Sequence, residues 1–179
     1  MLHDNKLLNL KTFKNFAVLG VEPHSNMKNL YFDIDGVLLS YDDVQRPVLT
    51  NGEMESRLKK LNFDKLICVS GWSDIVNSGI KTDLQQKKSI HSILNKVFPD
   101  ENWFINKLEL AYDTDDRCQH IDLDSDWYYI DDWADKFFSE CFGEILYEKE
   151  LGNRILLVNP HGDGSDILDW LDKLGVNKC

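Results

Sequence analysis

Short apolar runs recur along the chain, with helical or polar stretches between them. They cover residues 30–34, 66–69, 127–130 and 155–158. Fully buried parallel strands read as continuous apolar runs, and strand–crossover–strand units place helices on both faces of a sheet. The pattern therefore predicts an α/β fold, a three-layer Rossmann-like domain with a central, mostly parallel sheet.

The stretches between these runs predict helices at residues 51–61, 81–97, 134–141 and 165–174. The last is the best marked, because Ser165 and Asp166 offer N-cap oxygens and Gly175 can stop the helix. Its apolar face consists of Ile167, Leu168, Leu171 and Leu174.

Length and composition favour one domain. A chain of 179 residues with 42% hydrophobic content can form a single core. We expect residues 30–179 to form this domain and residues 1–29, which contain several apolar side chains, to be an appendage packed on it. No stretch approaches the ~20 apolar residues of a membrane span, and no leader pattern opens the chain, so a cytoplasmic location without membrane contact is expected.

The net charge of -11 disfavours nonspecific nucleic-acid binding, because an acidic surface repels phosphate backbones. Much of the excess lies between Tyr112 and Asp135, where nine aspartates accompany the single basic residue Arg117. Most of such a run is expected to be a solvated face, and a minority of its members to carry chemistry.

Two aspartates, Asp33 and Asp35, end the first apolar run and precede Gly36. Period two places both carboxylates on one side of the strand end, where open α/β sheets bind ligands. A carboxylate that attacks phosphorus needs a hard cation such as Mg²⁺ to neutralise the incoming phosphate. The pair therefore predicts a magnesium-dependent phosphatase, in which Asp33 is the nucleophile and Asp35 transfers the proton.

The segment from Asp33 to Leu38 resembles the first motif of the haloacid dehalogenase superfamily. The resemblance implies that Asp33 forms an aspartyl-phosphate, and that Asp35 is the general acid and base and gives its main-chain carbonyl to magnesium. An aspartate rather than a threonine at position 35 is similar to the phosphatase members.

Residues 66–72 resemble the second motif of that superfamily, an apolar strand ending in Ser or Thr. The resemblance implies that Ser70 binds the transferring phosphoryl group. The hydroxyl and the main-chain N–H groups that follow, at Gly71 and Trp72, form a small anion site at a strand end.

Residues 127–132 resemble the Asp-Asp form of the fourth motif. Asp132 would be the principal magnesium ligand, together with Asp33 and Asp35. Adjacent residues of a strand cannot both point straight at one ion, so Asp131 is expected to accept hydrogen bonds behind the ligands or to hold a metal-bound water.

The third motif requires a cation that stabilises the phosphorylated aspartate. Arg117 stands in the right order, although a planar guanidinium is not equivalent to a lysine ammonium. Lys107, Lys87 and Lys88 are the alternatives.

Residues 36–65 leave room for a loop and one helix, so we expect no large cap over the site. An open site admits a small or macromolecular phosphorylated substrate, such as a phosphoprotein or a polynucleotide end. The pattern over residues 30–172 also resembles the small phosphatase-type domains associated with RNA-repair proteins. Two alternatives remain: a nucleotidase that stacks a base on Trp72, Trp103 or Trp127, and a regulatory module that binds phosphate or metal with little turnover.

Overall fold

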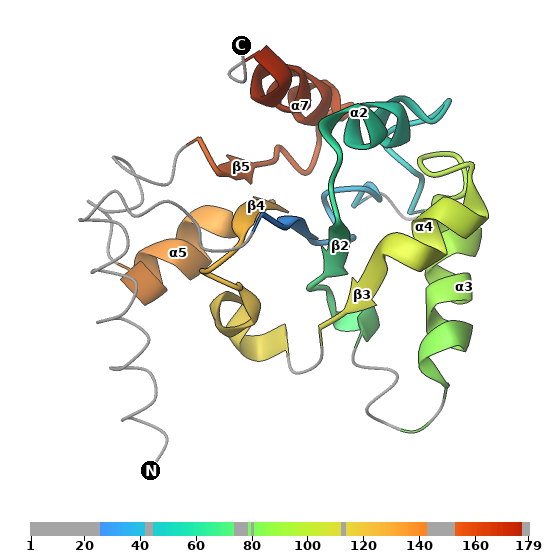
Figure 1. Ribbon diagram of the computed structural model, residues 1–179, viewed down its shortest axis with the longest axis horizontal. Coiled ribbons are helices and arrows are strands. Elements are labelled where there is room, and N and C mark those ends of the chain that lie inside the picture. The colour runs from blue at the N-terminus through green and yellow to red at the C-terminus, as the bar shows by residue number, and fades with distance from the viewer. Residues whose placement is uncertain are drawn as a thin grey trace.

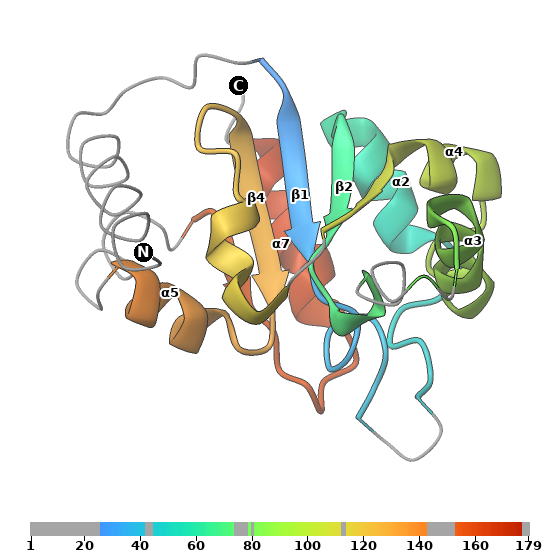
Figure 2. The same cartoon turned by 90° about the horizontal axis from the view of Figure 1, so that it is seen from below.

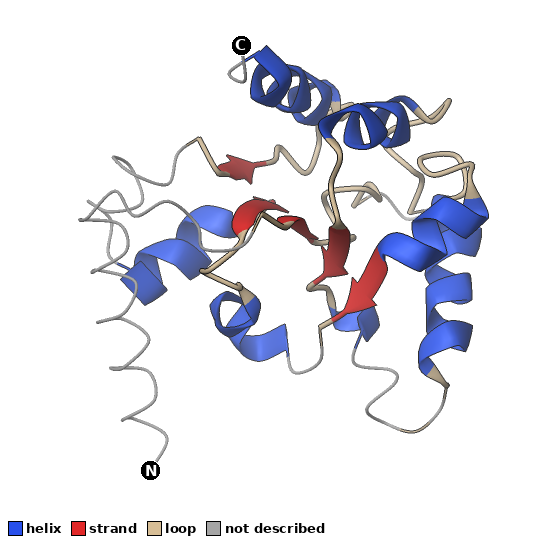
Figure 3. Cartoon of the chain, viewed as in Figure 1, coloured by secondary structure: helices blue, strands red, loops and turns tan. Residues whose placement is uncertain are grey.

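The computed structural model describes residues 26–41, 45–73, 79, 81–111, 114–142 and 153–176. Within them, five strands form one entirely parallel sheet in the order β3-β2-β1-β4-β5 (Figures 1 and 3). The predicted α/β, Rossmann-like architecture is therefore confirmed. The strands are β1 (Lys28–Phe32), β2 (Lys65–Cys68), β3 (Leu108–Leu110), β4 (Asp126–Asp131) and β5 (Ile155–Leu157).

All four predicted helices are present, with ends shifted by a few residues. They are α2 (Glu53–Leu61), α3 (Asp83–Leu94), α5 (Ala134–Phe142) and α7 (Ser165–Val176). A capping box between Thr82 and Gln85 fixes the start of α3. Gly175 does not stop the last helix, which continues to Val176. The sequence did not locate β3 or α4 (Glu101–Lys107); two 3₁₀ helices, η1 (Gly71–Ser73) and η2 (Thr114–His120), complete the described elements.

Helical layers cover both faces of the sheet. In Figure 1, α2 and α7 lie on one side of the strands and α5 and η2 on the other. Leu30 and Phe32 of β1 belong to the main core, which also includes buried side chains of α2, α3, α4 and α7. Tyr31 points the other way and packs in the core formed with α5. By the same alternation, Asp33 leaves the sheet on the side of Tyr31.

Strand register brings the polar residues that follow three strands to one edge. Phe32 pairs with Cys68 of β2 and with Ile130 of β4. Just beyond the strand ends, β1 makes one further main-chain hydrogen bond with each neighbouring strand. Asp33 N donates to Ile130 O at 3.1 Å, and Val69 N donates to Phe32 O at 3.0 Å. The carboxyl ends of β1, β2 and β4 therefore meet at the lower edge of the sheet in Figure 2.

The connections that flank β2 contain helices packed on the sheet. Among the described residues, α2 lies between β1 and β2, and α3 and α4 lie between β2 and β3. The appendage predicted for residues 1–29 falls mostly outside the described residues, and β1 begins at Lys28. None of the described helices has the length and apolar character needed to cross a membrane.

We predict that Leu94→Ala lowers the free energy of unfolding by about 3 kcal/mol, because Leu94 in α3 is fully buried in the main core. Leu84→Ala in the same helix is the matched control; Leu84 is 52% exposed, and its removal is expected to cost less than about 0.5 kcal/mol. Urea denaturation measures both, and equal losses in the two variants would contradict this packing.

Candidate active site

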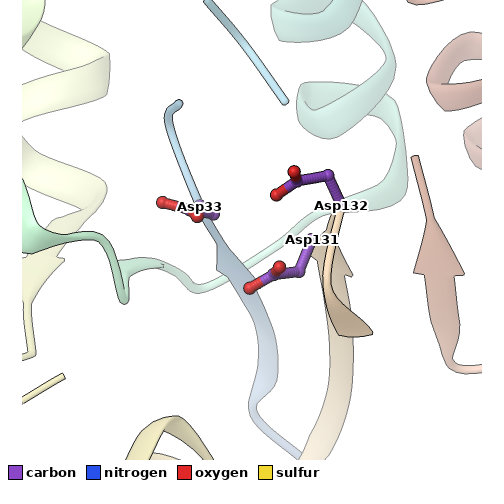
Figure 4. Close-up of side chains that lie close together, drawn as sticks. All are labelled: Asp33, Asp131 and Asp132. Carbon is purple, nitrogen blue, oxygen red and sulfur yellow. The ribbon is translucent and has the colours of Figure 1, made fainter. Parts of the chain in front are cut away.

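Three carboxylates converge at the carboxyl edge of the sheet (Figure 4). Asp33 directly follows β1, Asp131 ends β4 and Asp132 comes next in the chain. One oxygen from each lies within 4.8 Å of the others. Asp33 and Asp131 are buried, while Asp132 is half-buried. Like charges this close and this far from water need a compensating cation.

Arg117 of η2 supplies that cation. Its Nη1 donates to Asp33 Oδ2 at 2.7 Å and also to Asp131 Oδ2. The guanidinium lies 4.8 Å from the centroid of the Phe137 ring, and its side chain is only 16% exposed. Burial acts against the charge of Arg117, but the two carboxylates outweigh it and raise the pKa of Arg117 above its ordinary value. The guanidinium thus ties η2 to β1 and β4.

Asp131 is surrounded by hydrogen-bond donors. Its Oδ2 accepts the Tyr129 hydroxyl at 3.1 Å in addition to Arg117, and its Oδ1 accepts the Trp133 main-chain N–H at 2.7 Å. Burial raises the pKa of Asp131 to about 6, although the charge of Arg117 opposes the shift. This geometry suits a carboxylate that holds its neighbours in place, which is the role predicted for it behind the metal ligands.

Asp132 is more accessible to solvent than its neighbour Asp131. Its Oδ2 accepts the Tyr41 hydroxyl at 3.0 Å. Burial, followed by the hydrogen bond to Asp132, raises the pKa of Tyr41 to about 12, so this hydroxyl keeps its proton at neutral pH. No local pattern in the sequence marks Tyr41 as a site residue.

Gly36 allows the Tyr41 side chain to reach Asp132. It has a φ of +75°, which is strained for residues with a side chain. A Cβ on Gly36 would lie 2.7 Å from a ring carbon of Tyr41 and 2.9 Å from Asp132 Oδ2. The glycine after the aspartate pair therefore both turns the chain and leaves room for Tyr41 and Asp132.

Asp35 lies beside the three carboxylates, and its own carboxylate is not part of their group. Its Oδ2 accepts the Trp72 indole N–H at 3.0 Å, and its Oδ1 accepts the Gln45 side chain at 3.4 Å. Burial raises the pKa of Asp35, the charge of Asp33 adds to the increase, and the Trp72 bond opposes it. A carboxyl group with a raised pKa is suited to carry a proton for a neighbouring reaction.

The segment after β2 reaches the same edge beside β1. Ser70 is buried at the strand end, and exposed Gly71 opens η1. Ser73 closes the turn, because its main-chain N–H donates to Ser70 O at 2.9 Å. Gln86 Nε2 donates to the Trp72 carbonyl oxygen at 2.5 Å. Ser70 and Gly71 thus follow the end of β2, and Trp72 contacts Asp35.

Among the four basic residues considered from the sequence, Arg117 is the one that the structure brings to the aspartates. Lys107 ends α4 directly before β3, and so lies at the amino edge of the parallel sheet, opposite the site. Lys87 pairs with Asp83 at 3.2 Å within α3, and Lys88 is exposed on the same helix.

Two of the three tryptophans proposed for base stacking lie elsewhere. Trp127 is buried in the core on the α5 side, where it stacks on Phe138. Trp103 in α4 packs against the main core, and the Lys59 ammonium lies 5.0 Å from the centroid of its ring. Trp72 is therefore the member of that set placed at the aspartates.

The donor set fits magnesium. Carboxylate oxygens are the ligands that hard divalent cations prefer, and three are close enough here to share one ion. Asp33 and Asp132 would be the ligands, since Asp131 already accepts three donors. One arginine cannot balance four neighbouring aspartates, so a cation would also relieve their repulsion.

Comparison of the chain with protein-family models, with curated proteins and with solved structures finds no match. The function is therefore inferred from the residues and their geometry.

We predict that Arg117→Met destabilises the metal-free protein by about 3 kcal/mol, because it leaves the fully buried Asp131 without its cation. Adding Asp131→Asn should recover part of the loss, so that the double variant costs about 1–3 kcal/mol less than the sum of the single ones.

The matched control for Arg117→Met is Arg57→Met, which breaks the surface pair of Arg57 with Asp172 and is expected to have a much smaller effect. Chemical denaturation of all four variants gives the comparison. Additive losses at Arg117 and Asp131 would contradict the buried pair.

We also predict that Mg²⁺ raises the melting temperature at pH 7.5 and that this rise is smaller at pH 5, because burial raises the pKa of Asp132 and a proton on this ligand competes with the metal. Asp131, which is not one of the two ligands, contributes separately to the stability of the metal-free protein. Its pKa, raised to about 6, stabilises the folded state fully below the unfolded pKa, and that contribution is lost as the pH rises through about 6. Thermal melts with and without Mg²⁺ test this, with Asp132→Asn as the variant that should lose the metal effect; an equal rise at pH 5 and pH 7.5 would contradict it.

Proposed function

We propose that this chain is a magnesium-dependent phosphomonoesterase that acts through an aspartyl-phosphate on Asp33. The observation that carries the proposal is the contact of Arg117 with both Asp33 and Asp131, beside Asp132, at the carboxyl edge of a parallel sheet. A carboxylate fixed by a buried cation, with a proton-carrying acid two residues further on, is what nucleophilic attack on phosphorus requires. The resemblance of residues 33–38 to the haloacid dehalogenase superfamily supports the same reading.

Both carboxylate oxygens of Asp33 accept hydrogen bonds, which fix the orientation of the side chain. Oδ1 accepts the Ile34 main-chain N–H at 2.7 Å and Oδ2 accepts Arg117 at 2.7 Å. In the first step, an oxygen of Asp33 bonds to phosphorus while the bond from phosphorus to the ester oxygen breaks, and Asp35 gives the departing oxygen a proton. In the second step, water attacks phosphorus, Asp35 recovers a proton from it, and the bond to Asp33 breaks. Fixed orientation of the carboxylate lowers the entropic part of the first barrier.

The remaining groups would hold the phosphoryl oxygens. Ser70 supplies a hydroxyl, and Gly71 and Trp72 supply main-chain N–H groups near the end of β2. Arg117 would stabilise the phosphorylated Asp33 through the guanidinium that already contacts this carboxylate. A magnesium ion held by Asp33 and Asp132 would neutralise charge on the transferring group.

We predict that wild-type protein hydrolyses an aryl phosphate in the presence of Mg²⁺ and that Asp33→Asn lowers kcat by on the order of 1000-fold, since the amide cannot act as the nucleophile. Asp35→Asn should also reduce kcat, while still permitting phosphorylation when the leaving group is a good one. Asp172→Asn, which alters an exposed carboxylate of α7, is the matched control and should retain the wild-type rate.

A beryllium fluoride complex gives a second measurement, because it mimics a phosphorylated aspartate and should form on Asp33 only when Mg²⁺ is present. Equal hydrolysis by wild type and Asp33→Asn would rule out the mechanism. Magnesium binding without turnover or adduct would instead indicate the regulatory module considered above.

A further inference from the structure

Two exposed aromatic residues are next to Asp132, Tyr41 through a side-chain hydrogen bond and Trp133 as its neighbour in the chain. Tyr41 is 51% exposed and Trp133 is 49% exposed. Tyr41 binds Asp132 through its hydroxyl, and Trp133 follows Asp132 in the chain. The other large hydrophobic side chains exposed within the described ranges are aliphatic: Met27, Leu84, Leu157 and Val176.

Tyr41 is held in place without being covered. Its hydroxyl donates to Asp132 Oδ2 at 3.0 Å, and its ring packs so closely on Gly36 that a Cβ there would lie 2.7 Å from the ring edge. About half of its surface nevertheless faces solvent. A ring fixed at one end and packed on backbone offers contact area at little cost in conformational entropy.

The main chain of Trp133 is held by a hydrogen bond. Its N–H donates to Asp131 Oδ1 at 2.7 Å, and the Lys136 ammonium lies 4.6 Å from the centroid of its indole. Neither contact buries the side chain, which stays half exposed. Several other aromatic rings pack on one another in the interior, as Tyr129 does on Phe138 at 4.9 Å between centroids.

Trp72 is a third aromatic residue beside the aspartates, but it is partly buried. Its indole N–H donates to Asp35 Oδ2 at 3.0 Å, and its ring packs partly against the main core. Tyr41 and Trp133, in contrast, are half exposed beside a group of carboxylates. Exposed aromatic side chains next to a charged site indicate a ligand surface, because core packing does not account for their exposure.

We propose that Tyr41 and Trp133 bind a planar aromatic group of a small phosphomonoester, whose phosphoryl group lies at Asp33. The inference rests on the proposed phosphatase function and narrows its substrate class to esters with a nucleobase or an aryl ring close to the phosphate. Stacking on aromatic side chains is tolerant of ring identity, because each such ring has a π-face. A small substrate is favoured over a polynucleotide because further phosphates would meet a chain with a net charge of -11.

The test compares substrates that differ by the ring alone. Adenosine 5′-monophosphate is paired with ribose 5-phosphate, and phenyl phosphate with cyclohexyl phosphate, each assayed for kcat/KM with Mg²⁺. Ratios within a pair are then compared between variants, so that the intrinsic reactivity of each ester cancels. Tyr41→Leu and Trp133→Leu should each reduce the preference for the aromatic member by about five- to tenfold, the lower part of the range for loss of one stacking ring.

Tyr41→Phe separates the ring from its hydroxyl. It removes the bond to Asp132 but keeps the ring, and should therefore retain the aromatic preference. Leu84→Ala, an exposed apolar position on α3, should leave every rate unchanged. A change confined to the first substrate pair would identify a nucleotide as the ligand, and one confined to the second pair an aryl phosphate.

Unchanged ratios in Tyr41→Leu and Trp133→Leu would overturn the inference while leaving the phosphatase intact. A wild-type protein that hydrolyses none of the esters would instead overturn the proposed function. In that case calorimetric dissociation constants for adenosine 5′-monophosphate and ribose 5-phosphate replace the rates, and equal affinities in wild type and Tyr41→Leu would overturn the inference as well.

Discussion

The contact of Arg117 with Asp33 and Asp131 is the interaction on which the site depends. A carboxylate as deeply buried as Asp131 is costly to keep charged, and the pair is stable only because the guanidinium and two further donors satisfy it. The same guanidinium holds η2 against the ends of β1 and β4. A segment of 3₁₀ helix, a conformation with poor intrinsic hydrogen-bond geometry, is thereby anchored by charge.

Parallel register accounts for how residues far apart in the chain come together. Because Phe32 is flanked by Cys68 and Ile130, the residues that follow each strand emerge at one edge. Alternation along β1 then sends Asp33 to the side of the sheet that η2 and α5 cover. The position of the candidate site is thus a consequence of strand pairing and side-chain period, to which loop geometry adds Gly36 and Tyr41.

Sequence pattern predicted what is strongly periodic or strongly apolar. The four short apolar runs form strands, and the aspartates at the ends of two of them lie together as expected. In contrast, β3 has only three residues and α4 has seven, of which Phe104 alone is buried, so neither produces a readable period. Tertiary packing, such as the stacking of Phe104 on Phe98 at 4.4 Å, determines where they form.

The contacts that define the site entrance were not predictable in the same way. Tyr41 and Asp132 are 91 positions apart, and nothing local to Tyr41 indicates its partner. Arg117 could be placed by order along the chain, but its bond to Asp131 could not, because a strand-end aspartate and a preceding arginine meet only once the fold has positioned η2. Exposure is likewise a property of the folded surface, which is why Trp133 did not stand out from the tryptophans that are buried.

The imbalance of one arginine against four aspartates would couple the binding of the cation to that of the phosphate. Arg117 is already engaged by two carboxylates, so a phosphate dianion without a cation would meet a site that is negative overall. On the proposed chemistry, the divalent cation and the phosphate each strengthen the binding of the other by the same factor. The cellular supply of the free cation, and not only of the phosphate ester, would therefore set how much of the protein is competent at any moment.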